Sequence, residues 1–260
     1  MRGGLVDERL TLREFSERYL ARFQVDRSPA TVKSLGWRLA RPLAEFGDVQ
    51  LSDLRTGEIA GWEATLPPRF RHDVVRALRQ VLDAAVAWEY LARNPARATG
   101  KNVRPAVLER IALEPSDVDK LAGEMRSPYD VAIVVGAWTY LRPSELLALE
   151  RGDVDGNVLH VRRTLDGQGG TKARGKTRRS LRTVPLPSRA RQALAELPPR
   201  LDTRLLFPAP SGAPWDACNF RRREFKWARE AGALDEAVTP YTLRHSGISW
   251  ALAAGIPKVT

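Results

Sequence analysis

The sequence predicts a mainly α-helical protein of two domains, the second of which also carries a small antiparallel β element. The first hundred residues repeat apolar side chains at helical spacing, which indicates an all-α unit. Residues 99–112 are basic, contain glycine and proline and have no such periodicity, which is typical of a linker. Farther on, residues 157–165 and 178–187 alternate apolar and polar side chains, a pattern typical of paired strands.

We expect four helices in the first domain, residues 11–98, after an N-terminal tail of residues 1–10. Thr11 and Glu14 have the spacing of a capping box, which predicts the start of the first helix. Ser28 is the expected N-cap of the second helix, which ends near Gly47. A short third helix over residues 56–66 and a fourth that starts near Arg71 complete the unit.

The second domain is expected to cover residues 113–260. A helix should begin at Ser116, and residues 127–141 are apolar nearly all round, which predicts a buried central helix. Helices resume after the two strands, at residues 188–197, 217–232 and 239–255. The tryptophans stand mostly at helix-face positions and are expected in the cores; they include Trp37, Trp62, Trp88, Trp138, Trp227 and Trp250.

Charge is the bulk property that bears most on function. A formal net charge of +11 and a pI near 10.3 favour a polyanionic partner, of which nucleic acid is the first candidate. An arginine-rich, high-GC genome would produce a similar bias. The charge is unevenly distributed, however: residues 162–182 hold eight basic side chains against one acid, Asp166, and residues 220–230 add a second cluster. This distribution favours nucleic-acid binding.

Other bulk properties narrow the class of protein. No apolar run reaches the roughly 18 residues of a membrane span, and the first ten residues lack the apolar core of a signal peptide. The single cysteine, Cys218, suits a reducing cytosol. The three histidines, His72, His160 and His245, are far apart, so that no metal site is expected. We therefore expect a cytoplasmic protein without a metal or a membrane partner.

One motif suggests a nucleotide-binding loop. Gly170, Gly175, Lys176 and Thr177 fit G-x-x-x-x-G-K-[ST], which cradles phosphates when a strand precedes it and a helix follows. Residues 178–187, however, alternate like a strand and end in a proline-containing turn. The pattern places Lys176 on a basic β-hairpin, and a nucleotide hydrolase remains only as a third hypothesis.

Three fragments of the second half carry a family resemblance. "YLRPSELLALERGDV" sets Arg142 at the start of a helix, the hairpin carries Lys176, and "TPYTLRHSGISWALAAG" sets Tyr241 and Arg244 three apart in a first helical turn. This ordered set, behind an all-α domain that ends in "NPA", resembles the tyrosine recombinase (phage integrase) family over residues 11–260. The resemblance implies an N-terminal SAM-like core-binding domain that clamps DNA and a mixed α/β catalytic domain, here incomplete at its C-terminus.

The resemblance also implies a role for each of these side chains. Arg142 and Arg244 would hold the non-bridging oxygens of a DNA phosphate, since guanidinium forks bind them bidentately. Lys176 would protonate the departing 5′ oxygen, with Lys172 as a rival four residues away. Tyr241 would position the phosphate by a hydrogen bond, because a phenol is a poor general base at neutral pH.

The chain departs from the family pattern in two motif positions. Tyr140 stands where the family has a glycine, and Tyr241 where it has a histidine. In the family a G-H segment and an attacking tyrosine follow, and neither is found up to Thr260, so that the chain alone is not expected to cleave DNA. Glu145 is expected to orient an arginine or to cap its helix, and His245 to serve packing.

Two main hypotheses follow. The first is site-specific DNA recombination or integration through a 3′-phosphotyrosine intermediate, on double-stranded DNA, with a homo-tetramer as the active assembly and no cofactor or small-molecule substrate. Such a protein would be cytoplasmic and associated with the nucleoid. The alternative is a non-catalytic DNA-binding or regulatory protein derived from an integrase, which the departure at Tyr241 and the absent nucleophile favour.

Overall fold

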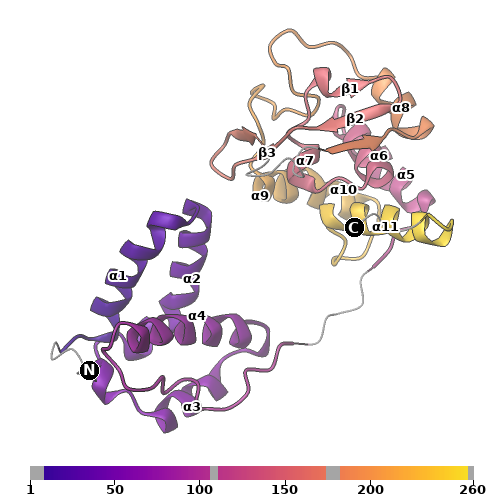
Figure 1. Ribbon diagram of the computed structural model, residues 1–260. Coiled ribbons are helices and arrows are strands. Elements are labelled where there is room, and N and C mark those ends of the chain that lie inside the picture. The colour runs from indigo at the N-terminus through magenta and orange to yellow at the C-terminus, as the bar shows by residue number, and fades with distance from the viewer. Residues whose placement is uncertain (1–8, 106–110, 174–181, 257–260) are drawn as a thin grey trace. The chain divides into compact units, whose positions relative to one another are not determined.

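The computed structural model describes residues 9–105, 111–173 and 182–256. The chain forms two compact units, Met1–Leu108 and Glu109–Thr260 (Figure 1). The boundary between them falls inside the linker that composition predicts over residues 99–112. Each unit has its own hydrophobic core.

The N-terminal unit contains the four expected α-helices: α1 (Leu12–Phe23), α2 (Pro29–Phe46), α3 (Thr56–Thr65) and α4 (Pro68–Ala87). The predicted caps are confirmed. The Glu14 carboxylate accepts a hydrogen bond from the Thr11 amide at 2.9 Å, and the Ser28 hydroxyl accepts one from the Thr31 amide at 3.3 Å. The expected start of the fourth helix near residue 71 was three residues late, because Pro68 occupies the first helical turn, where its missing amide hydrogen costs nothing.

Helices α1 and α2 pack on α4, which carries the most buried face of this unit (Figure 1). Leu78 and Leu82 of α4 are fully buried beside Leu39 of α2 and Phe15 of α1. Burial of such a side chain stabilises the fold by about 1.5–3 kcal/mol. Four helices joined by short turns therefore make a core of their own.

Helices dominate the C-terminal unit as well. They are α5 (Pro115–Gly123), α6 (Tyr129–Thr139), α7 (Pro143–Leu146), α8 (Ser188–Ala195), α9 (Ala217–Phe220), α10 (Lys226–Ala231) and α11 (Pro240–Ala253), with a π-helical turn, Arg221–Phe225, between α9 and α10. As predicted, α6 is buried nearly all round, and it packs against α5, α8 and α11. Helix α5 begins one residue before the expected Ser116, because Glu114 serves as its N-cap.

The predicted antiparallel β element is confirmed in the second unit. Strands β1 (Val154–Asp155), β2 (Val158–Val161) and β5 (Arg182–Pro185) form a sheet in the order β1-β2-β5. The first alternating segment breaks after Val161, and β3 (Arg163–Leu165) pairs separately with β4 (Thr171–Ala173). Val161 of β2 stands opposite Arg182 of β5, which brings this arginine to the edge of the site described below.

The tryptophan prediction was wrong at three positions. Trp37 and Trp227 are 83% and 60% exposed, and Trp88 is 36% exposed. Trp62, Trp138 and Trp250 are partly buried and pack against the cores as expected. Helical spacing shows which face a residue occupies, but another element must cover that face to bury it, and the sequence pattern does not show this.

Candidate functional site

The site begins where the buried helix α6 ends. Tyr140 has a left-handed backbone (φ 56°), after which the chain turns through Leu141 and starts α7 at Arg142. A left-handed conformation costs a residue with a Cβ about 1–2 kcal/mol, which explains why the family pattern has glycine at this position. The turn places Arg142 at the first turn of α7 and leaves the Tyr140 carbonyl group facing α11.

Glu145 binds Arg142 twice. Its Oε2 accepts a hydrogen bond from the Arg142 amide at 3.0 Å, and its Oε1 accepts one from Arg142 Nη1 at 2.9 Å. The carboxylate is buried (2% exposed), whereas the side chain of Arg142 is 45% exposed. Both roles expected of Glu145, capping its helix and orienting an arginine, are thus present in one side chain.

A second arginine holds the same carboxylate. Arg182, the first residue of β5, donates from Nη2 to Glu145 Oε2 at 2.7 Å and from Nη1 to Oε1 at 3.3 Å. Sequence analysis did not single out Arg182, because it is one of several arginines in a basic run and lies 37 residues from Glu145. The pairing becomes visible only when β5 is placed beside α7.

These contacts keep Glu145 ionised. Burial by itself would raise the pKa of the carboxyl group, but the hydrogen bonds from the Arg142 amide, from Arg182 and from the Arg142 side chain outweigh it. The pKa of Glu145 therefore lies below its ordinary value. The buried group is a carboxylate with two charge-assisted partners, which are among the stronger hydrogen bonds in proteins.

Arg244 reaches the same place from α11. It is half-buried, and its Nη1 donates a hydrogen bond to the Tyr140 carbonyl oxygen. Burial, followed by repulsion from Arg142, lowers the pKa of Arg244. An arginine nevertheless stays protonated in a protein. The charge of Arg244 therefore lies close to the like charge of Arg142 and to the opposite charge of Glu145.

Close packing of α11 on α6 positions Arg244. A Cβ atom on Gly247 would lie 1.9 Å from the Ala137 carbonyl oxygen and 2.6 Å from Cδ1 of Tyr140. Only glycine permits this approach, because any larger side chain would push the two helices apart. The left-handed Tyr140, whose ring fills this contact, and Gly247 together seat the first turn of α11 beside the start of α7.

The other predicted site residues have different outcomes. Tyr241 lies one turn before Arg244 on α11, and its exposed side chain is close enough to contribute to the pKa of Arg244. Lys176 lies outside the described residues. Its rival Lys172 is exposed on β4, opposite Thr164. His245 is half-buried on α11.

The described parts of the nucleotide-loop motif do not have the geometry of a phosphate cradle. Residues 171–173 form β4, and the next described element is β5, again a strand and not the helix that such a loop requires. Within residues 9–105, 111–173 and 182–256, no group of three or more His, Cys, Asp or Glu side chains is arranged to hold a metal ion. In the same part of the chain, no helix has the length and apolar character needed to cross a membrane.

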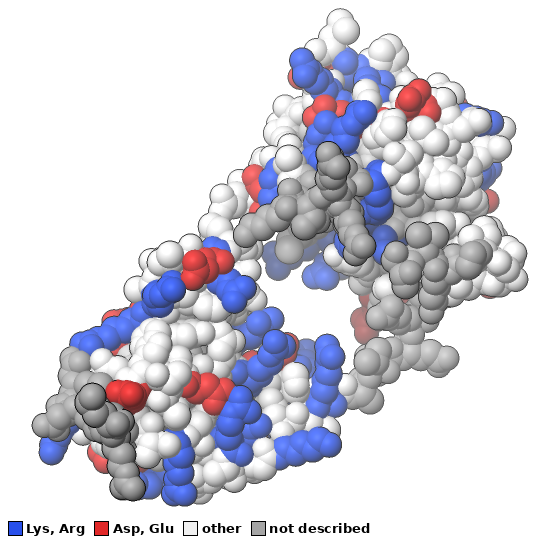
Figure 2. Space-filling model, viewed as in Figure 1, with Lys and Arg blue, Asp and Glu red and all other residues white. Residues whose placement is uncertain are grey.

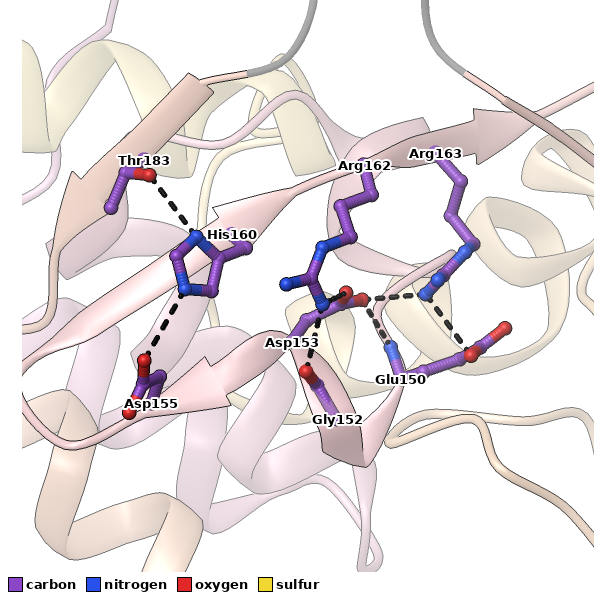
Figure 3. A network of polar contacts seen from close by, with 8 residues as sticks. All are labelled: Glu150, Gly152, Asp153, Asp155, His160, Arg162, Arg163 and Thr183. Carbon is purple, nitrogen blue, oxygen red and sulfur yellow. Dashed lines mark hydrogen bonds and ion pairs between the residues drawn. The ribbon is translucent and has the colours of Figure 1, made fainter.

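A second acid–arginine cluster lies near β2 and β3 (Figure 3). Asp153, 1% exposed, accepts hydrogen bonds from Arg162 Nη1 at 3.1 Å and from Arg163 Nη1 at 2.6 Å. Arg163 also pairs with Glu150 at 3.3 Å, and Arg162 donates to the Gly152 carbonyl oxygen at 2.8 Å. These contacts fix the junction between β2 and β3.

The fold of the chain is that of the tyrosine recombinases. The integrase of transposon Tn1549, solved with transposon right-end DNA, superposes with a TM-score of 0.77 over 95% of this chain and 88% of that chain, at 19% sequence identity. A lambda integrase dimer bound to a COC′ core site superposes with a TM-score of 0.78 over 94% of this chain and 71% of that chain, at 17% identity.

The chain belongs to the phage integrase family, whose model matches residues 112–259. A putative prophage phiRv2 integrase of Mycobacterium tuberculosis is 28% identical over 241 residues, which cover 82% of this chain and 60% of that protein. The integrase of Mycobacterium phage D29 is 30% identical over 187 residues, which cover 68% of this chain and 49% of that protein. The chain thus matches about half to three-fifths of the length of these relatives.

Proposed function

We propose that this protein is a site-specific tyrosine recombinase that breaks and rejoins duplex DNA through a 3′-phosphotyrosine intermediate. The observation that carries the proposal is the arrangement of Arg142, Arg182 and Arg244 around one buried carboxylate, Glu145. In the part of the chain that the structure describes, these three guanidinium groups and one acid carry a surplus of positive charge at a partly exposed site. Relatives named as integrases, and similar folds solved on DNA, support the same activity.

Arg142 and Arg244 would bind the non-bridging oxygens of the phosphate under attack. Among the described residues, the side-chain hydrogen bonds of Arg142 use only Nη1, so that Nε and Nη2 can donate to a ligand. Arg244 uses Nη1 for the Tyr140 carbonyl group and has the rest of its fork available in the same way. Negative charge grows on these oxygens as phosphorus becomes five-coordinate. Fixed guanidinium groups therefore stabilise the transition state more than the ground state.

Lys176 and Tyr241 complete the proposed site. A tyrosine other than Tyr241 attacks phosphorus through its hydroxyl oxygen and gives up its own proton to water. The bond from phosphorus to the 5′ oxygen breaks, and Lys176 gives its proton to that departing oxygen. Tyr241, exposed one helical turn before Arg244, would donate a hydrogen bond to the phosphate. The phosphotyrosine bond conserves the energy of the broken linkage, which is why we propose that neither ATP nor a metal ion takes part.

The N-terminal unit would grip DNA as a clamp. Lys and Arg side chains form several patches on its visible face, with fewer Asp and Glu side chains between them (Figure 2). Helices α2 and α4 contribute exposed basic side chains at Lys33, Arg38, Arg41, Arg69 and Arg76. Such a surface binds phosphates without reading sequence, and each phosphate contact makes the affinity more sensitive to salt.

Strand cleavage by arginine variants tests the proposal. The assay uses the protein translated to the natural stop codon of its gene, on duplexes that carry its own recombination site. Arg142→Ala or Arg244→Ala should each lower the rate of covalent complex formation by about 10²–10³-fold, the usual cost of one charge-stabilising donor. Arg162→Ala is the matched control, since Arg162 also pairs with a buried acid and is 48% exposed. Normal cleavage by both site variants would contradict the assignment.

A non-catalytic DNA-binding protein derived from an integrase is the second candidate, favoured by Tyr241 at a histidine position. Lys176→Ala separates the two candidates. If Lys176 is a general acid, the variant should lose cleavage rate and keep its DNA affinity. If Lys176 only contacts DNA, the variant should bind more weakly, and the slope of log affinity against log salt should fall by about 0.9.

Self-association on DNA is a further part of the proposal. A lambda integrase tetramer has been solved on a Holliday junction, with a TM-score of 0.77 to this chain. We propose a homo-tetramer on paired recombination sites, acting in the cytoplasm at the nucleoid. Mass photometry of the protein with and without site DNA should show four copies only on DNA. A species of one copy per site at every protein concentration would contradict the tetramer.

A further inference from the structure

Arg182 is the side chain of this site that the proposed reaction leaves without a role. It uses both terminal nitrogens of its guanidinium group on the two oxygens of Glu145, at 2.7 and 3.3 Å. Arg142, in contrast, gives that carboxylate only one side-chain nitrogen. Arg182 therefore donates both terminal nitrogens to Glu145, whereas Arg142 has nitrogens that can donate to another ligand.

Competition for Glu145 explains why this division matters. The carboxylate is buried, and an ionised group out of water draws on whatever cations can reach it. If Arg182 were removed, Arg142 would be the one of these two arginines that still contacts Glu145. Its guanidinium group could then rotate so that two of its nitrogens donate to the carboxylate. The nitrogens of Arg142 that we assign to the phosphate would then donate to Glu145 instead.

The charge of the site points the same way. The site has three positive charges, on Arg142, Arg182 and Arg244, and one negative charge, on Glu145. The net charge of these four side chains is +2. Loss of the Arg182 charge would halve this surplus. Both effects, the diverted fork and the smaller surplus, weaken the hold on an anion.

We propose that Arg182 is a positioning residue, which neutralises Glu145 so that the Arg142 guanidinium remains available to a DNA phosphate. This inference rests on the proposed function, in which Arg142 binds that phosphate. It predicts that, among variants that are folded at the assay temperature, removal of the Glu145 charge should restore the DNA affinity that is lost when the Arg182 charge is removed.

The test measures DNA affinity by fluorescence anisotropy, with the full chain and a labelled 30-base-pair duplex at several salt concentrations. Arg182→Gln should bind about tenfold more weakly, the cost of roughly one charge-assisted hydrogen bond, and Arg142→Ala should lose a similar amount. The double variant Arg182→Gln/Glu145→Gln should bind nearly as well as the parent, because two neutral amides can pair and Arg142 is released. Melting temperatures show that each variant is folded.

The possible outcomes distinguish failure of this inference from failure of the proposed function. Recovery of affinity in the double variant supports the inference. A double variant that binds no better than Arg182→Gln, or an Arg182→Gln that binds like the parent while Arg142→Ala does not, overturns it and leaves the proposed function standing. If Arg142→Ala binds like the parent, the phosphate role of the site fails, and this inference fails with it.

A second variant covers the case in which Arg182→Gln melts below the assay temperature. Arg182→Lys keeps the charge but replaces the planar fork by a single ammonium group. It should bind with an affinity between those of the parent and Arg142→Ala, and Glu145→Gln in the same chain should raise that affinity. Affinity that falls further when Glu145→Gln is added would overturn the inference.

Discussion

Two clusters of the C-terminal unit have the same core, one buried acid held by two arginines, and yet differ in charge. Asp153 is held by Arg162 and Arg163, and the nearby Glu150 pairs with Arg163 as well, so that two acids balance two arginines (Figure 3). Glu145 is held by Arg142 and Arg182, and among the described residues Arg244 adds a further positive charge at that site.

Exposure does not distinguish the two clusters. The side chains of Arg142 and Arg162 are 45% and 48% exposed, and both donate to an acid that is almost completely buried. The number of donors in use does not distinguish Arg142 from Arg162 either, since among the described residues the side-chain hydrogen bonds of both use Nη1 alone. The difference lies in the ratio of acids to arginines. In the proposed function, this difference in charge is the reason why an anion would bind beside Arg142 and not beside Arg162.

The largest effect on stability is expected at the balanced cluster. Asp153→Ala leaves Arg162 and Arg163 without their common partner and frees the junction between β2 and β3. Removal of one member of a buried ion pair costs several kcal/mol, and we expect about 3 kcal/mol here because Arg162 remains half-exposed. Urea unfolding measures this loss. DNA affinity of the folded variant should not fall, because the change leaves the Glu145 site intact and removes a negative charge. A loss as large as that of Arg142→Ala would contradict the distinction between the two clusters.

A smaller, pH-dependent effect is expected at Glu145. Its pKa is lowered in the folded protein, mainly by the hydrogen bonds from the Arg142 amide and from Arg182, which outweigh the effect of burial. The stability from this shift is fully present above the unfolded pKa of about 4.3 and is lost as pH falls through the lower folded pKa.

Glu145→Gln removes this titration and keeps the shape of the side chain. Its free energy of unfolding, measured from pH 7 to pH 3, should lie below that of the parent at pH 7, and the two values should approach each other below about pH 4. A difference that grows as the pH falls would mean that the Glu145 carboxylate is not stabilised in the fold.

The smallest effect should appear in the salt dependence of DNA binding. If Arg142 contacts one phosphate, Arg142→Ala should lower the slope of log affinity against log salt by about 0.9. Arg162→Ala should leave the slope almost unchanged, because its charge is already balanced by Asp153. Equal slopes for the two variants would mean that the charge surplus at Glu145 does not attract DNA.

Local parts of this architecture could be predicted from the sequence. The capping boxes at Thr11 and Glu14, and at Arg142 and Glu145, involve side chains three residues apart, and that spacing determines the contact. The buried helix α6 was predictable because its sequence is apolar all round. In each case the information lies within one element.

Contacts between distant segments could not be predicted in this way. Arg182 meets Glu145 only because β5 pairs with β2 beside α7, and no pattern within the basic run distinguishes Arg182 from its neighbours. The prediction that Trp37 is buried was wrong for the same reason, since the sequence does not show which helix face another element covers. The left-handed Tyr140 is a further example, because sequence alone identified the replaced glycine but not the carbonyl group that its backbone presents to Arg244.

The most direct test of the central claim is a crystal structure of the chain bound to duplex DNA. The account predicts that guanidinium nitrogens of Arg142 and Arg244 lie about 3 Å from non-bridging oxygens of one and the same phosphate, while Arg182 remains on Glu145. Arg162 and Arg163 should still hold Asp153. The account would be contradicted by a complex in which Arg142 and Arg244 contact different phosphates or none. It would also be contradicted if a DNA phosphate were held by the arginines of the Asp153 cluster instead.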